Sequence, residues 1–163
     1  MIVKDIIDSD FVNYKKYSMF IAFPFCTFKC DKLNGYKVCQ NAHLAHEPNI
    51  EVNMVDLINR YLNNNLTEAV VMGGMEPFDS FEDLKEFVWA LRHMFACDDD
   101  IVIYTGYNKE EIKEQVEWLS QFPNIIIKFG RFIMNQQPHY DEVLGVNLAS
   151  KNQYAQKIGI SKG

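Results

Sequence analysis

The sequence lacks the features that mark membrane proteins, nucleic-acid-binding proteins and secreted proteins. No apolar run approaches the roughly 20 residues of a membrane-spanning helix, and Lys4 and Asp5 interrupt the N-terminus before a signal-peptide core could form. Lys and Arg number 16 against 22 Asp and Glu, and this net charge of −6 disfavours binding to phosphate backbones. We therefore expect a cytoplasmic protein with neither a membrane nor a nucleic acid as partner.

The chain also lacks internal repeats, low-complexity tracts and Pro- or Gly-rich linkers, so we expect a single domain over residues 1–163. Hydrophobic residues make up 48% of the chain and aromatic residues 13%, which is ample for a packed core. This composition excludes disorder as the main state.

Cysteines are few, and their distribution is informative. Of the four, Cys26, Cys30 and Cys39 fall within fourteen residues, whereas Cys97 stands alone. A disulfide framework would need a secretory context, which is not evident, and the loop between the grouped cysteines is too polar for a core. The three grouped thiols therefore indicate a metal centre, and we expect Cys97 to be a structural thiol.

Two kinds of metal centre fit this spacing. Three thiolates can hold three irons of a [4Fe–4S] cluster and leave the fourth iron open to a substrate or cofactor. With His43, the spacing Cys26-x3-Cys30-x8-Cys39-x3-His43 could instead form a closed Cys₃His zinc site. The first indicates an enzyme and the second a zinc-stabilised binding or adaptor module, and spacing alone does not separate them.

Short apolar runs alternate with amphipathic segments along the chain. The runs predict strands, and they cover 18–25, 68–72, 101–104 and 125–129. The segments between them predict helices that begin at Met54 after the cap Asn53, at Ser80 with Asp83 as a capping box, and at Asn108. This alternation predicts a mostly parallel sheet with right-handed crossovers, either doubly wound or part of a barrel.

The unusual residues follow the predicted strands. In parallel α/β folds, ligands bind at the carboxyl ends of the strands, where every strand-to-helix loop emerges. In chain order these residues are Cys26, then Gly73-Gly74-Met75-Glu76-Pro77, then Tyr104-Thr105-Gly106-Tyr107, and last Gly130-Arg131. We expect one rim to gather them. Taken alone, the glycines could belong to an ordinary strand-to-helix turn. A structural zinc site, however, does not require these turns at the same rim as the cysteines.

These motifs, in this order, resemble the radical S-adenosylmethionine enzymes, and among them the activating proteins of anaerobic (class III) ribonucleotide reductase. The resemblance covers roughly residues 18–158 and includes two later segments, 130–133 and 149–153, and Asn41 after the last cysteine. Two features depart from the family pattern. Eight residues separate Cys30 from Cys39, and Met75 is inserted before Glu76.

The resemblance implies an α/β fold of a particular kind, a partial (incomplete) parallel β/α barrel of the radical S-adenosylmethionine type. A full barrel needs about 200 residues or more, so this chain would leave a lateral opening that suits a protein substrate. Cys26, Cys30 and Cys39 would ligate a [4Fe–4S] cluster. The residues implied in binding S-adenosylmethionine are Asn41, Gly73, Gly74, Glu76, Tyr104, Thr105, Gly106, Tyr107 and Arg131.

The resemblance also implies roles and partners. The backbone at Gly73 and Gly74 would pair with the methionine part of S-adenosylmethionine. Glu76 would accept a hydrogen bond from the ammonium group of that ligand. Arg131 would bind a carboxylate or form a surface ion pair. A reductant such as flavodoxin or ferredoxin would drive cleavage of S-adenosylmethionine. The resulting radical would act on a glycyl-radical enzyme, the large subunit of anaerobic ribonucleotide reductase. Another protein, a peptide or a small molecule is the alternative target.

Overall fold

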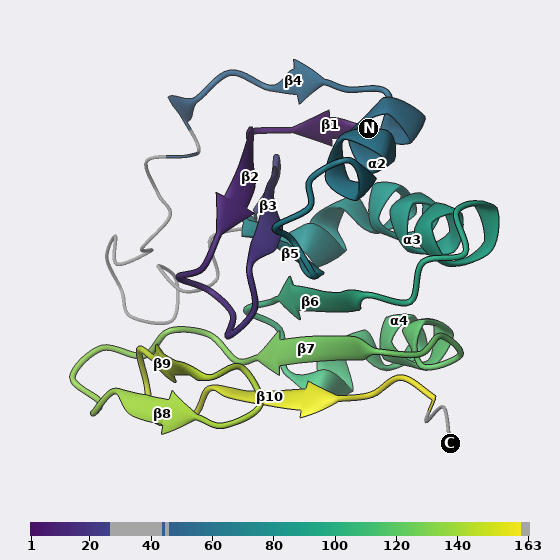
Figure 1. Cartoon of the computed structure of the whole chain (residues 1–163). Helices are drawn as coiled ribbons and strands as arrows, with labels where there is room; N and C mark the ends of the chain where they lie inside the picture. Colours follow the sequence, from purple (N-terminus) through teal and green to yellow (C-terminus); the bar gives the residue numbers. More distant parts are fainter. Residues whose placement is uncertain (27–43, 45, 161–163) are drawn as a thin grey trace.

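The computed structural model describes residues 1–26, 44 and 46–160. A six-stranded sheet in the order β10-β7-β6-β5-β3-β2 forms its centre (Figure 1). These strands are β2 (Asp5–Asp10), β3 (Ser18–Phe23), β5 (Ala69–Gly74), β6 (Asp100–Tyr104), β7 (Ile125–Phe129) and β10 (Tyr154–Lys157). The strands β3, β5, β6 and β7 are parallel, and β2 and β10 pair antiparallel at the two edges.

Helices and two short ribbons complete the described part of the chain. The helices are α2 (Met54–Leu62), α3 (Phe81–Trp89) and α4 (Lys113–Leu119). The 3₁₀ turns η2 (Pro77–Ser80) and η4 (Lys109–Ile112) lead into α3 and α4, and the π-helical turn η3 (Ala90–Met94) extends α3. The ribbons pair β1 (Ile2–Val3) with β4 (Ile50–Glu51), and β8 (His139–Asp141) with β9 (Val146–Leu148). Within the described ranges, none of the helices combines the length and apolar character that crossing a bilayer requires.

The predicted strands and helices are confirmed, with small shifts at their ends. The Asn53 side chain caps α2 by accepting from the Asp56 N–H at 3.0 Å, as predicted. The capping box at Ser80 was wrong, because η2 runs directly into α3 and Ser80 is not at a free helix start. Asp83 instead accepts from the N–H of Ile2 at 3.2 Å, which ties α3 to the N-terminal ribbon.

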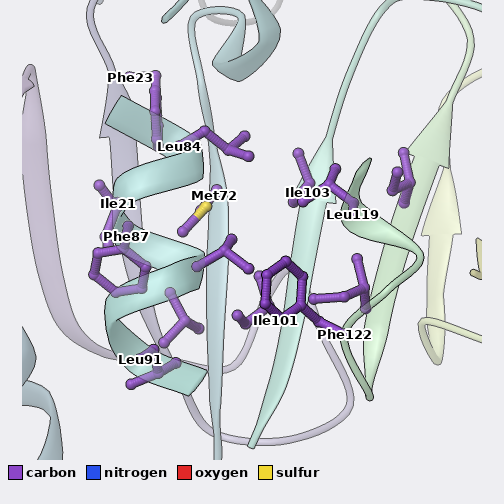
Figure 2. Close-up of a cluster of buried hydrophobic side chains, with 14 of the residues drawn as sticks. Ile21, Phe23, Met72, Leu84, Phe87, Leu91, Ile101, Ile103, Leu119 and Phe122 are labelled. Atoms are coloured by element: carbon purple, nitrogen blue, oxygen red, sulfur yellow. The ribbon is translucent and has the colours of Figure 1, made fainter. Parts of the chain in front are cut away.

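The helices cover one face of the sheet. Buried side chains of α2, α3 and α4 form one cluster with alternate residues of the parallel strands. Figure 2 shows Ile21 and Met72 of the strands near Leu84 and Phe87 of α3, and Ile103 beside Leu119 of α4. Each such fully buried side chain contributes roughly 1.5–3 kcal/mol, so this cluster is the main source of stability.

The opposite face of the sheet has two regions, one that packs against a hairpin and one that lines a cavity. Near the start of the strands, Val71, Val102 and Ile126 pack beneath Leu144 and Leu148 of the β8–β9 hairpin. Further along, the residues on this face line a cavity. The parallel strands follow the sequence without the reversal that marks a doubly wound sheet, and their helices lie on one side. The partial barrel itself stays a prediction.

Candidate functional site

A cavity of about 620 Å³ lies at the carboxyl ends of the parallel strands, on the face opposite the helices. Its walls also include the start of β2, the loop after it, and the hairpin segment 146–149. The predicted site residues that line it are Cys26, Gly73, Gly74, Glu76, Tyr104, Thr105 and Gly106. Three separate turns therefore meet in one place, as the strand pattern predicts.

The other predicted site residues fall into two groups. One group lies outside the described residues and consists of Cys30, Cys39, Asn41 and the alternative zinc ligand His43. Tyr107 and Arg131 are described and are not among the residues that line the cavity. The Tyr107 hydroxyl donates to Asp79 at 2.6 Å, and the Arg131 guanidinium lies over the Tyr107 ring and forms an ion pair with Glu111 at 2.6 Å. Of the two predictions for Arg131, the ion pair is thus present.

The two glycines at the end of β5 are needed for different reasons. A Cβ on Gly73 would lie 3.2 Å from the end of the Phe20 ring and would project into the cavity. Gly74 has a φ of +80°, and a Cβ there would lie 2.7 Å from the Cβ of Ala22. Because β3 and β5 pair in register up to Phe23 and Gly74, this close approach is built into the sheet.

Glu76 joins two of the turns. Its carboxylate is only 7% exposed and accepts from the Thr105 hydroxyl at 2.8 Å, from the Gly106 N–H at 2.8 Å and from the Phe78 N–H at 3.1 Å. These donors come from both the β5 and the β6 turn. The structure therefore gives Glu76 a role in holding the cavity wall, and its contact with a ligand ammonium group stays a prediction.

Burial raises the pKa of Glu76 from 4.5 to about 7, although its hydrogen-bond donors favour the charged form. Between about pH 4.5 and 7 the unfolded chain loses this proton and the folded chain keeps it, so stability falls as pH rises through this window. Over this window we expect the free energy of unfolding to fall by up to roughly 3 kcal/mol more in the unchanged protein than in Glu76→Gln. Urea unfolding of both proteins from pH 4 to 8 measures the difference. Parallel pH profiles for the two proteins would contradict this prediction.

Sequence reasoning missed Lys128, which sits in the middle of the otherwise apolar strand β7. It is 7% exposed and lines the cavity beside its register partner Tyr104. The ammonium group donates to the Gly130 carbonyl at 3.1 Å and lies 5.6 Å from the centre of the Tyr104 ring. The available signal was a single lysine at a buried position of a predicted strand, where lysine is rarely found without a partner or a function.

Cys26 and Cys97 lie in different surroundings. Cys26 is half-buried and lines the cavity three residues after β3 ends. Cys97 follows η3 in the chain, packs against the helix-covered core and lies outside the cavity lining, and burial raises the pKa of its thiol, which disfavours the thiolate that metals require. Among the described residues alone, no three His, Cys, Asp or Glu side chains gather as a metal site. A cavity lined by the Cys26 thiol and by two glycines has a ligand and space for a cluster. Cys30 and Cys39 are the other two predicted ligands.

The chain resembles a known protein family. A family model described as a 4Fe-4S single cluster domain matches residues 16–154. No curated protein and no solved structure matches the chain. The matched span contains all three grouped cysteines and the four parallel strands at whose carboxyl ends the cavity lies, and it favours the iron–sulfur interpretation over zinc.

Proposed function

Because the chain belongs to the 4Fe-4S single cluster domain family, we propose that it is a radical S-adenosylmethionine enzyme that generates a glycyl radical on a partner enzyme. The observation that carries this proposal is the single cavity in which Cys26 adjoins Gly73, Gly74 and the Tyr104–Gly106 turn. The proposed partner is the large subunit of an anaerobic ribonucleotide reductase, and the proposed electron donor is a flavodoxin or ferredoxin.

The cluster would be held by Cys26, Cys30 and Cys39. When bound and reduced by the electron donor, the cluster would supply the electron for reductive cleavage of S-adenosylmethionine, and hydrogen-atom abstraction from the target glycine would follow. The protein's own contribution is to bind the sulfonium ligand, to orient it and to keep water away from it.

The cavity residues have chemical groups suited to these tasks. Gly73 exposes the backbone at the end of β5, so the amino-acid part of a ligand could approach and pair with it. Tyr104 offers a flat wall for the nucleoside, and the Lys128 ammonium beside it would balance the ligand carboxylate. Glu76 would act by holding the Thr105–Gly106 turn in place.

The sheet face next to the cavity is apolar, because Val102 and Ile126 pack with Leu144 and Leu148 in one hydrophobic cluster. The ligand and its target would enter at the carboxyl ends of the strands. The lateral opening of a partial barrel would admit the loop of a folded protein, which favours a protein target over a peptide or a small molecule.

The test is anaerobic reconstitution followed by assay. We expect brown protein with about four irons per chain, and 5′-deoxyadenosine when the reduced protein is mixed with S-adenosylmethionine. Adding an anaerobic ribonucleotide reductase large subunit should produce a glycyl radical detectable by electron paramagnetic resonance. Colourless protein with one tightly bound zinc would contradict the proposal, and 5′-deoxyadenosine without a glycyl radical would point to one of the other targets.

A further inference from the structure

The segment 149–153 lies against the cavity wall at Gly130. Gln153 is 7% exposed, and its Nε2 donates to the Gly130 carbonyl oxygen at 3.2 Å. The Lys128 ammonium donates to the same oxygen at 3.1 Å. A carbonyl oxygen has two lone pairs, so one acceptor atom joins the two buried side chains.

The Gln153 amide is fixed in one orientation. Its Oε1 accepts from the N–H of Ser150 at 3.1 Å, which leaves Nε2 facing Gly130. Ser150 is fully buried, and its hydroxyl accepts from the N–H of Ile133 at 3.2 Å. The turn is therefore anchored to the same loop that carries Gly130.

The backbone at Gly130 is closely packed against this turn. Its φ is +105°, and a Cβ there would lie 3.2 Å from the Asn152 Nδ2 and 3.3 Å from the Gln153 Cα. Its N–H donates to the Tyr107 carbonyl at 3.0 Å. The direction of the Gly130 carbonyl is thus set by the turn on one side and by the end of β6 on the other.

We propose that Gln153 is a positioning residue, which holds the Gly130 carbonyl so that the Lys128 ammonium stays at the cavity wall and binds the carboxylate end of the ligand. This inference rests on the proposed function, in which that ligand is S-adenosylmethionine. A lysine side chain loses much conformational freedom when it binds a ligand, and a carbonyl that already holds its ammonium removes part of that cost.

The test is a double-mutant cycle read out by equilibrium binding to the anaerobic holoprotein with its cluster oxidised, so that no turnover occurs. The probes are S-adenosylmethionine and decarboxylated S-adenosylmethionine. We expect Lys128→Met to weaken binding of the first roughly tenfold and Gln153→Met about fivefold, with changes below about twofold for the second probe. In the Lys128→Met background, Gln153→Met should have no further effect on either probe.

The matched control is Lys151→Gln, because Lys151 lies in the same turn and its side chain is exposed. It should bind both probes as the unchanged protein does. If Gln153→Met does not fold, Gln153→Asn replaces it, since the shorter amide cannot span from Ser150 to Gly130.

Two results would overturn the inference while leaving the proposed function intact. One is a Gln153→Met effect of equal size on both probes or in both backgrounds, since a merely structural role would produce it. The other is full affinity in Gln153→Met. Failure of the unchanged holoprotein to bind S-adenosylmethionine would instead refute the proposed function, and this inference with it.

Discussion

Replacing Cys26 with alanine should abolish cluster binding and lower 5′-deoxyadenosine formation more than about a hundredfold. Cys26 is the described cysteine that lines the cavity, and it follows the strand whose neighbour carries Gly73 and Gly74. A ligand lost from a three-cysteine set leaves an iron without its thiolate, which costs more than the 10- to 100-fold typical of residues that only support ligands. Iron content, visible absorbance and 5′-deoxyadenosine measure the effect.

The control for this prediction is Cys97→Ala. Cys97 is half-buried against the core and lies outside the cavity lining, so this variant should keep its iron and lose at most about 1 kcal/mol of stability. Loss of iron in Cys97→Ala, with retention in Cys26→Ala, would show that the ligands have been misassigned.

Gly74→Ala should destabilise the protein by roughly 3 kcal/mol. A φ of +80° costs a residue with a side chain about 1–2 kcal/mol, and a methyl group forced against packed atoms costs about 1–3 kcal/mol more. Here the nearest atoms are the Cβ of Ala22 at 2.7 Å and its Cα at 2.8 Å. Because Ala22 lies within the paired strand β3, neither backbone can move away without breaking the sheet. Urea unfolding measures the loss.

Gly73→Ala is the matched comparison one residue earlier. Its new methyl group would lie 3.2 Å from the end of the flexible Phe20 side chain and at an ordinary contact distance of 3.5 Å from the Tyr104 Cβ, and it would narrow the cavity. We expect a loss of less than about 1 kcal/mol in stability and a clear loss of affinity for S-adenosylmethionine. Equal destabilisation by the two variants would show that crowding against β3 is not what requires glycine at 74.

The sequence predicted the centre of the fold well, because it is built from regular units. The parallel strands are short apolar runs, amphipathic helices separate them along the chain, and both signals are local. The convergence of Cys26, Gly73 and Tyr104 followed from strand direction alone, and the cavity lining confirms it.

The edges of the sheet could not be predicted in the same way. Strand β2 is the acidic segment Asp5–Asp10, and β10 is Tyr154–Lys157, with a single buried residue. Their strand conformation comes from pairing with β3 and β7, which is a tertiary effect. The partners of Glu76 were hidden for the same reason, since Thr105 and Gly106 reach it from about 30 residues away.

Side chains alternate between the two faces of the parallel strands, so substitutions that reduce stability and substitutions that alter the cavity fall at different positions. In β5, β6 and β7, Met72, Ile103 and Ile127 belong to the helix-covered core, whereas their neighbours Gly73, Tyr104 and Lys128 face the cavity. Substitutions of the second set alter ligand chemistry while the principal source of folding energy stays intact. The scaffold can therefore acquire new specificities by small steps. If the proposed function holds, a protein inactivated at these positions would still fold and would compete with the active form for the proposed glycyl-radical partner.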